Sequence, residues 1–302
     1  MLEVKNLTRK FDDKIAVNNI SFQVKPGVVT GLLGPNGAGK TTTMRLITGF
    51  LQASSGDVIY NGKSTLEENI ELKKKLGYLP ESAPLYPEMK IDEYLQYMAS
   101  IRGIATGEQK ARIDEMVQLC ELEAKMQSLI GHLSKGYKQR VALAGTLIHD
   151  PELIILDEPT SGLDPNQISH IRGLIKKLGK EKILILSTHI LQEVEDICDE
   201  VIIIHNGQIV ANSSVKGLHS GYKMLVSTNA ETKAMESIFS QGIFQGVETH
   251  DTLGEGFYSY LVNMSEYKPE AVFESMRNSS FKVREIKVHK KSLETIFSEL
   301  TK

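Results

Sequence analysis

The segment from Gly34 to Thr42, which reads GPNGAGKTT, combines residue types that bind phosphate groups. Gly34, Gly39, Lys40 and Thr41 follow the G-x-x-x-x-G-K-[ST] spacing. Glycines let the backbone curl until successive N–H groups face phosphate oxygens, and a helix that follows places its positive end there. We expect Lys40 to reach the β- and γ-phosphates of a nucleotide and the Thr41 hydroxyl to ligate Mg²⁺. The other residues expected in this phosphate loop are Asn36, Gly37, Ala38 and Thr42.

Two adjacent carboxylates, Asp157 and Glu158, follow the apolar run at 153–156. A phosphate loop needs an acidic metal partner, which normally ends a buried strand. We expect Asp157 to hold Mg²⁺ through water and Glu158 to orient and deprotonate the attacking water. By itself the pair could be a plain strand end with solvated acids. Burying both is costly without a cation nearby, so the phosphate loop favours the metal interpretation.

Composition limits the classes of protein that fit. The chain has 302 residues, which favours two domains, and a net charge of −3 with no long Lys/Arg block, which disfavours a nucleic-acid groove. Its two cysteines, Cys120 and Cys198, match no metal-ligand spacing. So few cysteines favour a protein of the reducing cytosol over one stabilised by disulfides. The charged N-terminus is unlike a signal peptide. No apolar run approaches the ~18 residues of a membrane span, so any such span must come from another chain.

Alternation of strands with helices predicts a parallel α/β sheet in the first two thirds of the chain. The expected strands are 2–7, 14–24, 28–33, 153–156, 183–186 and 201–204, with a strand–turn–strand over 56–64 and helices at 41–50 and from about 90 to 130. Gly62-Lys63-Ser64 imitates the end of a phosphate loop. Residue 57 is Asp rather than the required glycine, so we interpret this segment as a turn.

A change of composition at 212–220 predicts a linker between a domain over 1–215 and an accessory domain over 220–302. In the second domain we expect strand 222–228, helix 231–241, strands 244–251 and 256–264, helix 267–278, strand 281–289 and helix 292–301. The βαββαβ order of its first six elements predicts a ferredoxin-like sandwich.

Further motifs make residues 1–215 resemble the ATP-binding cassette (ABC) ATPases. In the family's order these are GYLPE (77–81), LSKGYKQR (133–140), SGLD (161–164) and STH (187–189), in addition to the loop and the carboxylate strand. The resemblance implies a P-loop NTPase cassette with a mixed sheet and a helical subdomain at about 88–150, followed by the small α+β domain. It also implies ATP hydrolysis, with ATP and Mg²⁺ as cofactors.

The resemblance assigns roles to matching positions. Phe11 stands where the family places an aromatic ring that stacks on adenine, although it could instead be a core residue of the first hairpin. Ser134 and Gly136 match the signature that caps the ATP of a partner subunit, and Ser134 would look the same as a purely local helix cap. Asp164 resembles the acid that links the two sites across a dimer, and His189 the histidine that contacts the γ-phosphate.

The sequence departs from the family pattern at two motifs. The usual glutamine after GYLP is Glu81, which could still reach the metal or the attacking water but adds negative charge beside Asp157 and Glu158. The signature reads LSKGY rather than LSGGQ, so Lys135 could approach the partner's phosphates or simply lie in solvent. Because neither change removes a residue expected to be catalytic (Lys40, Glu158 or His189), we expect hydrolysis to be retained.

Within the family, the chain is most similar to single-cassette subunits of exporters in the multidrug, sodium and gliding-motility-associated group, whose C-terminal ending resembles KKSLETIFSELTK. This implies a cytoplasmic protein, peripheral on the inner face of the cell membrane, that pairs with itself or a related second cassette. Its other partner would be an integral membrane permease contacted by segment 82–90 and the helices of 91–130. The apolar Ala83, Leu85 and Tyr86 could mark that contact, or could equally be buried loop residues. The alternative is a soluble cassette ATPase of translation or DNA maintenance. A single cassette, and no room for a coiled coil between Lys40 and Ser134, disfavour it.

Overall fold

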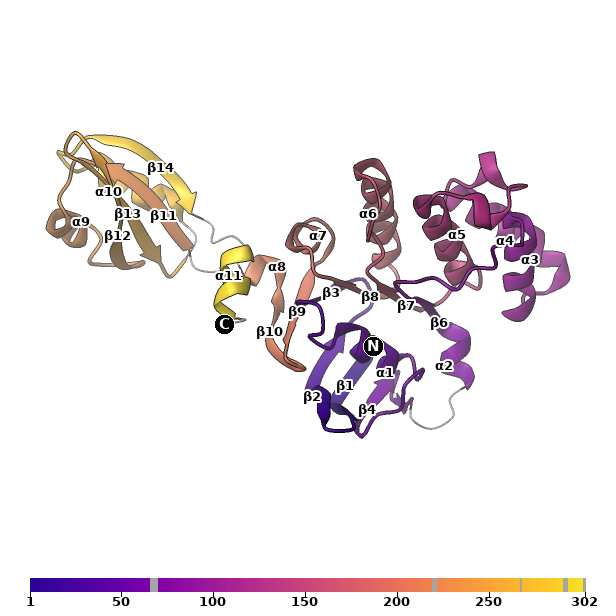
Figure 1. Ribbon diagram of the computed structural model, residues 1–302. Coiled ribbons are helices and arrows are strands. Elements are labelled where there is room, and N and C mark those ends of the chain that lie inside the picture. The colour runs from indigo at the N-terminus through magenta and orange to yellow at the C-terminus, as the bar shows by residue number, and fades with distance from the viewer. Residues whose placement is uncertain (66–69, 219–221, 267, 290–292, 301–302) are drawn as a thin grey trace. The chain divides into compact units, whose positions relative to one another are not determined.

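Two β-sheets form the first part of the computed structural model, which describes residues 1–65, 70–218, 222–266, 268–289 and 293–300 (Figure 1). The chain divides into two units, Met1–Val215 and Lys216–Leu300. The larger sheet of the first unit contains β3 (Val29–Leu33), β6 (Leu76–Leu79), β7 (Leu153–Asp157), β8 (Ile183–Thr188), β9 (Glu200–His205) and β10 (Gln208–Ser214). Its order is β10-β9-β3-β8-β7-β6, and only the β10–β9 pair among these described strands is antiparallel.

The second sheet of this unit is antiparallel and has the order β2-β1-β4-β5. Its strands are β1 (Leu2–Phe11), β2 (Lys14–Val24), β4 (Ser55–Tyr60) and β5 (Lys63–Ser64). A continuous apolar core joins it to the larger sheet and to helix α1 (Lys40–Ile47). Leu7 and Val24 contribute from one sheet, Met44 from α1, and Ile155 and Ile185 from the other. This core fixes the start of α1, and so the phosphate loop, against the sheet.

Helices α6 (Pro165–Gly179) and α7 (Leu191–Ile197) pack on β3 and β8. Because β7 and β8 are covered on both faces, all of their residues are buried and the strands read as unbroken apolar runs. Parallel strands of this kind end on one edge of the sheet, which brings Asp157 and Thr188 to the same region.

A group of helices lies beyond the β6 edge of the larger sheet (Figure 1). It consists of α3 (Ile91–Ile101), α4 (Thr106–Leu119) and α5 (Lys135–Leu147), with the 3-10 turns Glu123–Lys125 and Ile130–His132 between α4 and α5 and with α2 (Ile70–Lys75) just before β6. Arg112 of α4 donates to the carbonyls of Leu147 and Ile148 at 2.8 and 2.7 Å. These charge-assisted bonds satisfy orphan carbonyls at the end of α5 and fix α4 to it.

A half-buried histidine, His149, lies just after α5. Its Nε2 lies 3.0 Å from the carbonyl oxygen of Leu76, so Nε2 carries the proton, while Nδ1 is buried without a partner. Burial lowers the pKa of His149 to about 4, helped by the positive charges of Arg102 and Arg112 and opposed by the hydrogen bond to Leu76 and by Asp150. As pH falls, His149 therefore takes up a proton near pH 6.5 in the unfolded chain but only at a lower pH in the folded chain.

We expect His149 to have no effect on the pH dependence of the free energy of unfolding above pH 6.5. Between pH 6.5 and 4, that free energy should fall as the pH drops. Denaturant unfolding of the full chain at several pH values measures the slope. His149→Gln keeps a donor to Leu76 but cannot titrate, so the slope should decrease in that variant. An unchanged slope would show that other groups cause the acid sensitivity.

The second unit has the strand order β12-β13-β11-β14, with every pairing antiparallel. Its elements are β11 (Tyr222–Thr228), α9 (Thr232–Ile238), β12 (Phe244–Gly254), β13 (Phe257–Met264), α10 (Pro269–Arg277) and β14 (Val283–His289), with α8 (Val215–Leu218) before them and α11 (Leu293–Leu300) after them. Its core contains Met235 and Phe239 of the α9 segment, Val272 and Met276 of α10, and the fully buried Tyr260. This is the βαββαβ sandwich predicted from the sequence.

The fold class expected from the sequence is confirmed, with local corrections. In the segment 212–220, β10 continues to Ser214 and α8 spans Val215–Leu218, while residues 219–220 lie outside the described ranges. The division between the two units falls within this segment, after Val215. The strand–turn–strand over 56–64 is confirmed, with Asn61 and Gly62, both at positive φ, in the turn; only Lys63 and Ser64 differ, because they form strand β5. Cys120 and Cys198 are buried and unpaired. Within the described ranges, no helix combines the length and apolar character needed to cross a bilayer.

Candidate active site

The phosphate loop follows β3 and leads directly into α1, as the motif requires. Gly39 has φ of +112°, and a Cβ there would lie 2.6 Å from the carbonyl oxygen of Ala16, so only glycine fits. The Ala38 carbonyl accepts from the N–H of Gly207, in the β9–β10 turn, at 2.9 Å. The loop is therefore clamped between two hairpins, and Ala38 itself is buried.

Lys40 occupies the centre of the loop with a side chain only 6% exposed. Its Nζ donates to the carbonyls of Gly34 at 2.8 Å and Pro35 at 3.3 Å, and lies 3.7 Å from Oε1 of Glu158. An ammonium held among carbonyl oxygens at a helix start can turn to an anionic ligand with little reorganisation.

Asp157 and Glu158 project from the end of β7 towards the same loop. The Thr41 hydroxyl donates to Oδ1 of Asp157 at 3.2 Å, and the Ser187 hydroxyl donates to the same oxygen at 2.5 Å. The N–H of Glu158 donates to Ser187 Oγ at 3.0 Å. Glu158 adopts φ of +50°, a conformation that is uncommon outside glycine and is typical of functional turns.

Glu158 is paired with His189 as well as with Lys40. Nδ1 of His189 lies 2.8 Å from Oε2 of Glu158. Burial raises the pKa of Glu158, while the positive charges of His189 and Lys40 oppose that rise. A partly desolvated carboxylate between an ammonium and an imidazole is an arrangement suited to a general base.

Lys40, Glu158 and His189 line an open cavity of about 640 Å³, whereas Asp157 is buried and is not among its lining residues. Of the residues predicted from the sequence it is lined by Phe11, Asn36, Gly37, Gly39, Lys40, Thr41, Thr42, Glu81, Glu158 and His189. Phe11 is 42% exposed beside the Arg9 guanidinium, so it is not a core residue. The cavity is also lined by Lys14, Ala16 and Ser161, none of which was assigned a role from the sequence, although Ser161 begins the SGLD motif.

Ser187 is the most informative residue that was missed. It is fully buried, and its hydroxyl makes two hydrogen bonds: it donates to Oδ1 of Asp157 and accepts from the backbone N–H of Glu158. The pairing of β7 with β8 places Asp157 directly opposite Ser187. Its position in the STH motif was the available signal, because the residue two before His189 must lie on the same strand end.

Ser134, Gly136 and Asp164 lie outside this cavity. Ser134 is the N-cap of α5 and accepts from the Tyr137 N–H at 3.4 Å, while Asp164 caps α6 by accepting from the Gln167 N–H at 3.0 Å. Gly136 packs against the Gln167 side chain. The starts of α5 and α6 therefore contact each other, separate from the phosphate loop of the same chain.

Lys135, which replaces the usual glycine of the signature motif, is exposed, but its ammonium lies against the Cα of Gly162. It thus bridges the signature to the SGLD segment of its own chain rather than extending only into solvent. Any larger residue at Gly162, which has φ of +70°, would displace this lysine.

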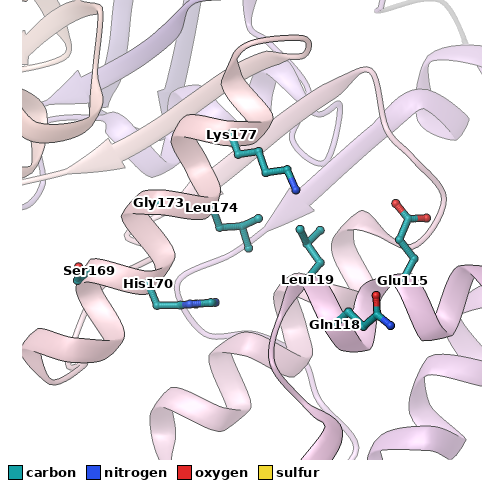
Figure 2. Close-up of a pocket in the computed structure, with 8 residues that line it drawn as sticks. All are labelled: Glu115, Gln118, Leu119, Ser169, His170, Gly173, Leu174 and Lys177. Atoms are coloured by element: carbon teal, nitrogen blue, oxygen red, sulfur yellow. The ribbon is translucent and has the colours of Figure 1, made fainter.

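A second crevice of about 530 Å³ lies between α4 and α6. Figure 2 shows Glu115, Gln118 and Leu119 on α4 facing Leu174 and Lys177 of α6. None of the residues predicted for the site lines it. Polar and apolar side chains both line this crevice, which lies where the helical group contacts α6. The 640 Å³ cavity therefore remains the candidate active site.

Comparisons with known proteins agree with this geometry. Residues 17–161 match the family model described as ABC transporter, and residues 129–195 match a model described as AAA domain, putative AbiEii toxin, Type IV TA system. "Uncharacterized ABC transporter ATP-binding protein YhcH" of Bacillus subtilis (strain 168) is 34% identical over 309 residues, which cover 100% of this chain and 96% of the relative.

A second relative and a solved structure are each similar to 72% of this chain. "Nod factor export ATP-binding protein I" of Burkholderia pseudomallei (strain 1710b) is 33% identical over 219 residues, which are 72% of this chain and 72% of that protein. The solved structure of cbiO1 from Clostridium perfringens, part of the ABC transporter complex cbiONQ, has a TM-score of 0.65 at 30% identity and covers 72% of this chain and 89% of its own. With its phosphate loop, paired carboxylates and cassette fold, the chain belongs to the ATP-binding subunits of ABC transporters and is an ATPase.

Proposed function

We propose that this ATPase drives export through a separate membrane-spanning permease. The observation that carries the proposal is an apolar groove of about 840 Å³ between the sheet edge and the helical group. Large apolar side chains stand exposed in it: Phe50 is 76%, Ile70 64% and Ile101 59% exposed. A hollow apolar surface of this size on a water-soluble cassette fits a partner's helix.

The groove has a defined shape and charge. Tyr86 and Tyr97 form an edge-to-face pair with ring centroids 5.5 Å apart on its wall. Arg45, Lys73 and Arg102 supply positive charge among its lining residues. The groove thus suits an amphipathic helix that presents apolar residues flanked by acidic ones. Of the three residues expected to contact a permease, Ala83 and Tyr86 line the groove, and Leu85 is not among its lining residues.

Two copies of the chain, or this chain and a related cassette, would bind ATP between them. Ser134, Gly136 and Asp164 lie outside the cavity of their own chain, which leaves them available to face the ATP of a partner. ATP would then favour the closed pair because it contacts both subunits, and hydrolysis would remove that preference. A permease helix in the groove would follow the cycle.

The oxygen ligands in the site fit Mg²⁺. Thr41 Oγ1 and Asp157 Oδ1 are 3.2 Å apart and Glu81 lines the same cavity, a set of hard oxygen donors that Mg²⁺ prefers. We propose that Thr41, Asp157 and Glu81 hold the ion, directly or through water. When bound, it would neutralise phosphate charge. Lys40 would orient the γ-phosphate, Glu158 would accept a proton from water, and His189 would fix Glu158.

The proposal places the protein in the cytoplasm, on the inner face of the membrane. The export direction rests on the resemblance to exporter subunits, which the name of the Burkholderia relative supports. The second unit has its own core and sheet, and we assign to it a regulatory or dimer-stabilising role. Nothing in the proposal requires nucleic acid.

The groove can be tested by capture of its partner. We expect full-length Glu158→Gln protein, tagged and purified with ATP from detergent-solubilised native membranes, to bring a stoichiometric multi-span protein with it. Adding Phe50→Ser and Ile101→Ser should abolish this capture, because two of the groove's three most exposed large apolar side chains are lost, while ATP binding stays unchanged. Phe273→Ser removes a similarly exposed aromatic, 57% exposed, from the second unit and is the matched control.

The outcomes separate the function classes. Loss of the membrane protein only with the groove variant supports the transporter proposal. Recovery of ribosomal or DNA-bound material without a membrane protein would contradict it and favour translation or DNA maintenance. Equal capture by the groove variant would move the permease contact to another surface.

A further inference from the structure

A buried carboxylate outside the cavity has no part in the mechanism described above. Glu193, on α7, is 1% exposed. Its Oε2 accepts from the Thr188 hydroxyl at 2.7 Å, and its Oε1 accepts from the Thr160 hydroxyl. Both threonines are themselves buried. A carboxylate is costly to bury, so one held by two buried hydroxyls indicates a specific requirement at this place.

The two threonines belong to the two segments that carry the candidate active site. Thr188 directly precedes His189, and its Oγ1 also accepts from the Ile190 N–H at 3.0 Å, which shapes the turn after β8. Thr160 lies in the loop between Glu158 and Asp164, and the Leu163 N–H bonds to its carbonyl at 3.2 Å. Glu193 thus joins the turn that carries His189 to the loop that begins with Glu158.

Glu193 also lies close to a side chain of α6. Nη2 of Arg172 lies 3.9 Å from Oε1 of Glu193, and its Nη1 lies 2.5 Å from Oδ2 of Asp196. Because α6 begins at the cap residue Asp164, the same carboxylate is connected to the helix that follows the SGLD segment. The nearby positive charge of Arg172 reduces the cost of burying Glu193.

We propose that Glu193 is a positioning residue for ATP hydrolysis, which holds His189 and the Glu158–Asp164 loop in one fixed relation. The inference rests on the roles proposed above for Glu158 and His189. Glu193 does not touch the cavity. It acts on turnover by keeping the 2.8 Å contact between His189 and Glu158, so its removal affects the chemical step more than ATP binding, which depends on the phosphate loop.

The test compares full-length variants by kcat, KM for ATP and thermal unfolding. We expect Glu193→Ala to lower kcat at least about tenfold and to change KM less than about threefold. Glu193→Gln retains the volume and one acceptor oxygen, so it should recover part of the lost kcat. Glu195→Gln makes the same change on an exposed residue of the same helix and should match the wild type.

A double variant distinguishes positioning from general loosening. If Glu193 acts through His189, then Glu193→Ala combined with His189→Ala should be no slower than the slower single variant. The inference would be overturned if the losses of kcat in the two single variants multiplied in the double variant, or if ATP affinity fell as much as kcat. An unchanged kcat in Glu193→Ala would overturn it as well. If that variant fails to fold, Thr188→Val, which removes only a hydroxyl, should show the same selective loss of kcat.

Glu158→Gln in the same assay keeps the two proposals apart. If it retains turnover, the proposed active site is wrong and the interpretation of Glu193 falls with it. If it abolishes turnover while Glu193→Ala and Thr188→Val do not lower it, only the positioning role is wrong.

Discussion

Replacing Glu158 with glutamine is expected to lower kcat for ATP hydrolysis about 10²–10⁴-fold, the range for loss of a general base. Glutamine keeps the size of the side chain but cannot accept a proton from water. Glu158 lies between Lys40 and His189, at 3.7 and 2.8 Å, and the amide can still occupy this place. ATP binding should therefore change less than about threefold, and ATP should now accumulate in closed pairs.

Single-turnover hydrolysis and size-exclusion chromatography with ATP measure the two effects. Glu195→Gln, the exposed control on α7, should hydrolyse ATP at the wild-type rate. Wild-type turnover by Glu158→Gln would show that another group activates the water. A fall in ATP binding as large as the fall in kcat would assign Glu158 to nucleotide binding instead.

Lys40→Ala should weaken ATP binding about 10–100-fold, which corresponds to the loss of one charged hydrogen-bonding group. The Lys40 ammonium is already in place, because carbonyls of the loop hold it at 2.8 and 3.3 Å. Truncation removes the positive charge and also leaves Glu158 with one cation fewer. Turnover at saturating ATP should fall as well, since Lys40 would contact the phosphate that is transferred.

The chain supplies its own control in Gly62-Lys63-Ser64. Lys63 is exposed at the β4–β5 turn, in a segment that has the same three-letter ending as a phosphate loop. Lys63→Ala should leave the affinity for ATP, measured by calorimetry, at the wild-type value. Equal losses in both variants would mean that overall charge, rather than the loop, attracts the nucleotide.

The sequence predicted the parts of the site that are consecutive in the chain. GPNGAGKTT contains every group of the phosphate loop, and Asp157 and Glu158 follow an apolar run whose burial is readable from composition. The order of elements in the second unit was also readable, because strand and helix periods differ and its turns are marked by glycine and asparagine.

The remainder depends on pairings between distant segments. The contact between Asp157 and Ser187 requires β7 and β8 to be neighbours, and the positive φ of Glu158 has no signature in its residue type. The placement of the linker's start at residue 212 has a similar origin. Asn212 and Ser213 are polar but pair with Ile202 and Val201 at the edge of the sheet, where one side of a strand tolerates polar residues.

The two buried thiols have a practical consequence for measuring motion. Cys120 is 0% and Cys198 8% exposed, and burial raises the pKa of Cys120 to about 12 and that of Cys198 even further. A thiol that is neither ionised nor accessible reacts slowly with maleimides. Cysteines introduced at exposed positions can therefore carry fluorophores on the otherwise native chain. Energy transfer between two labelled copies can then test in real time whether they approach each other when ATP is added.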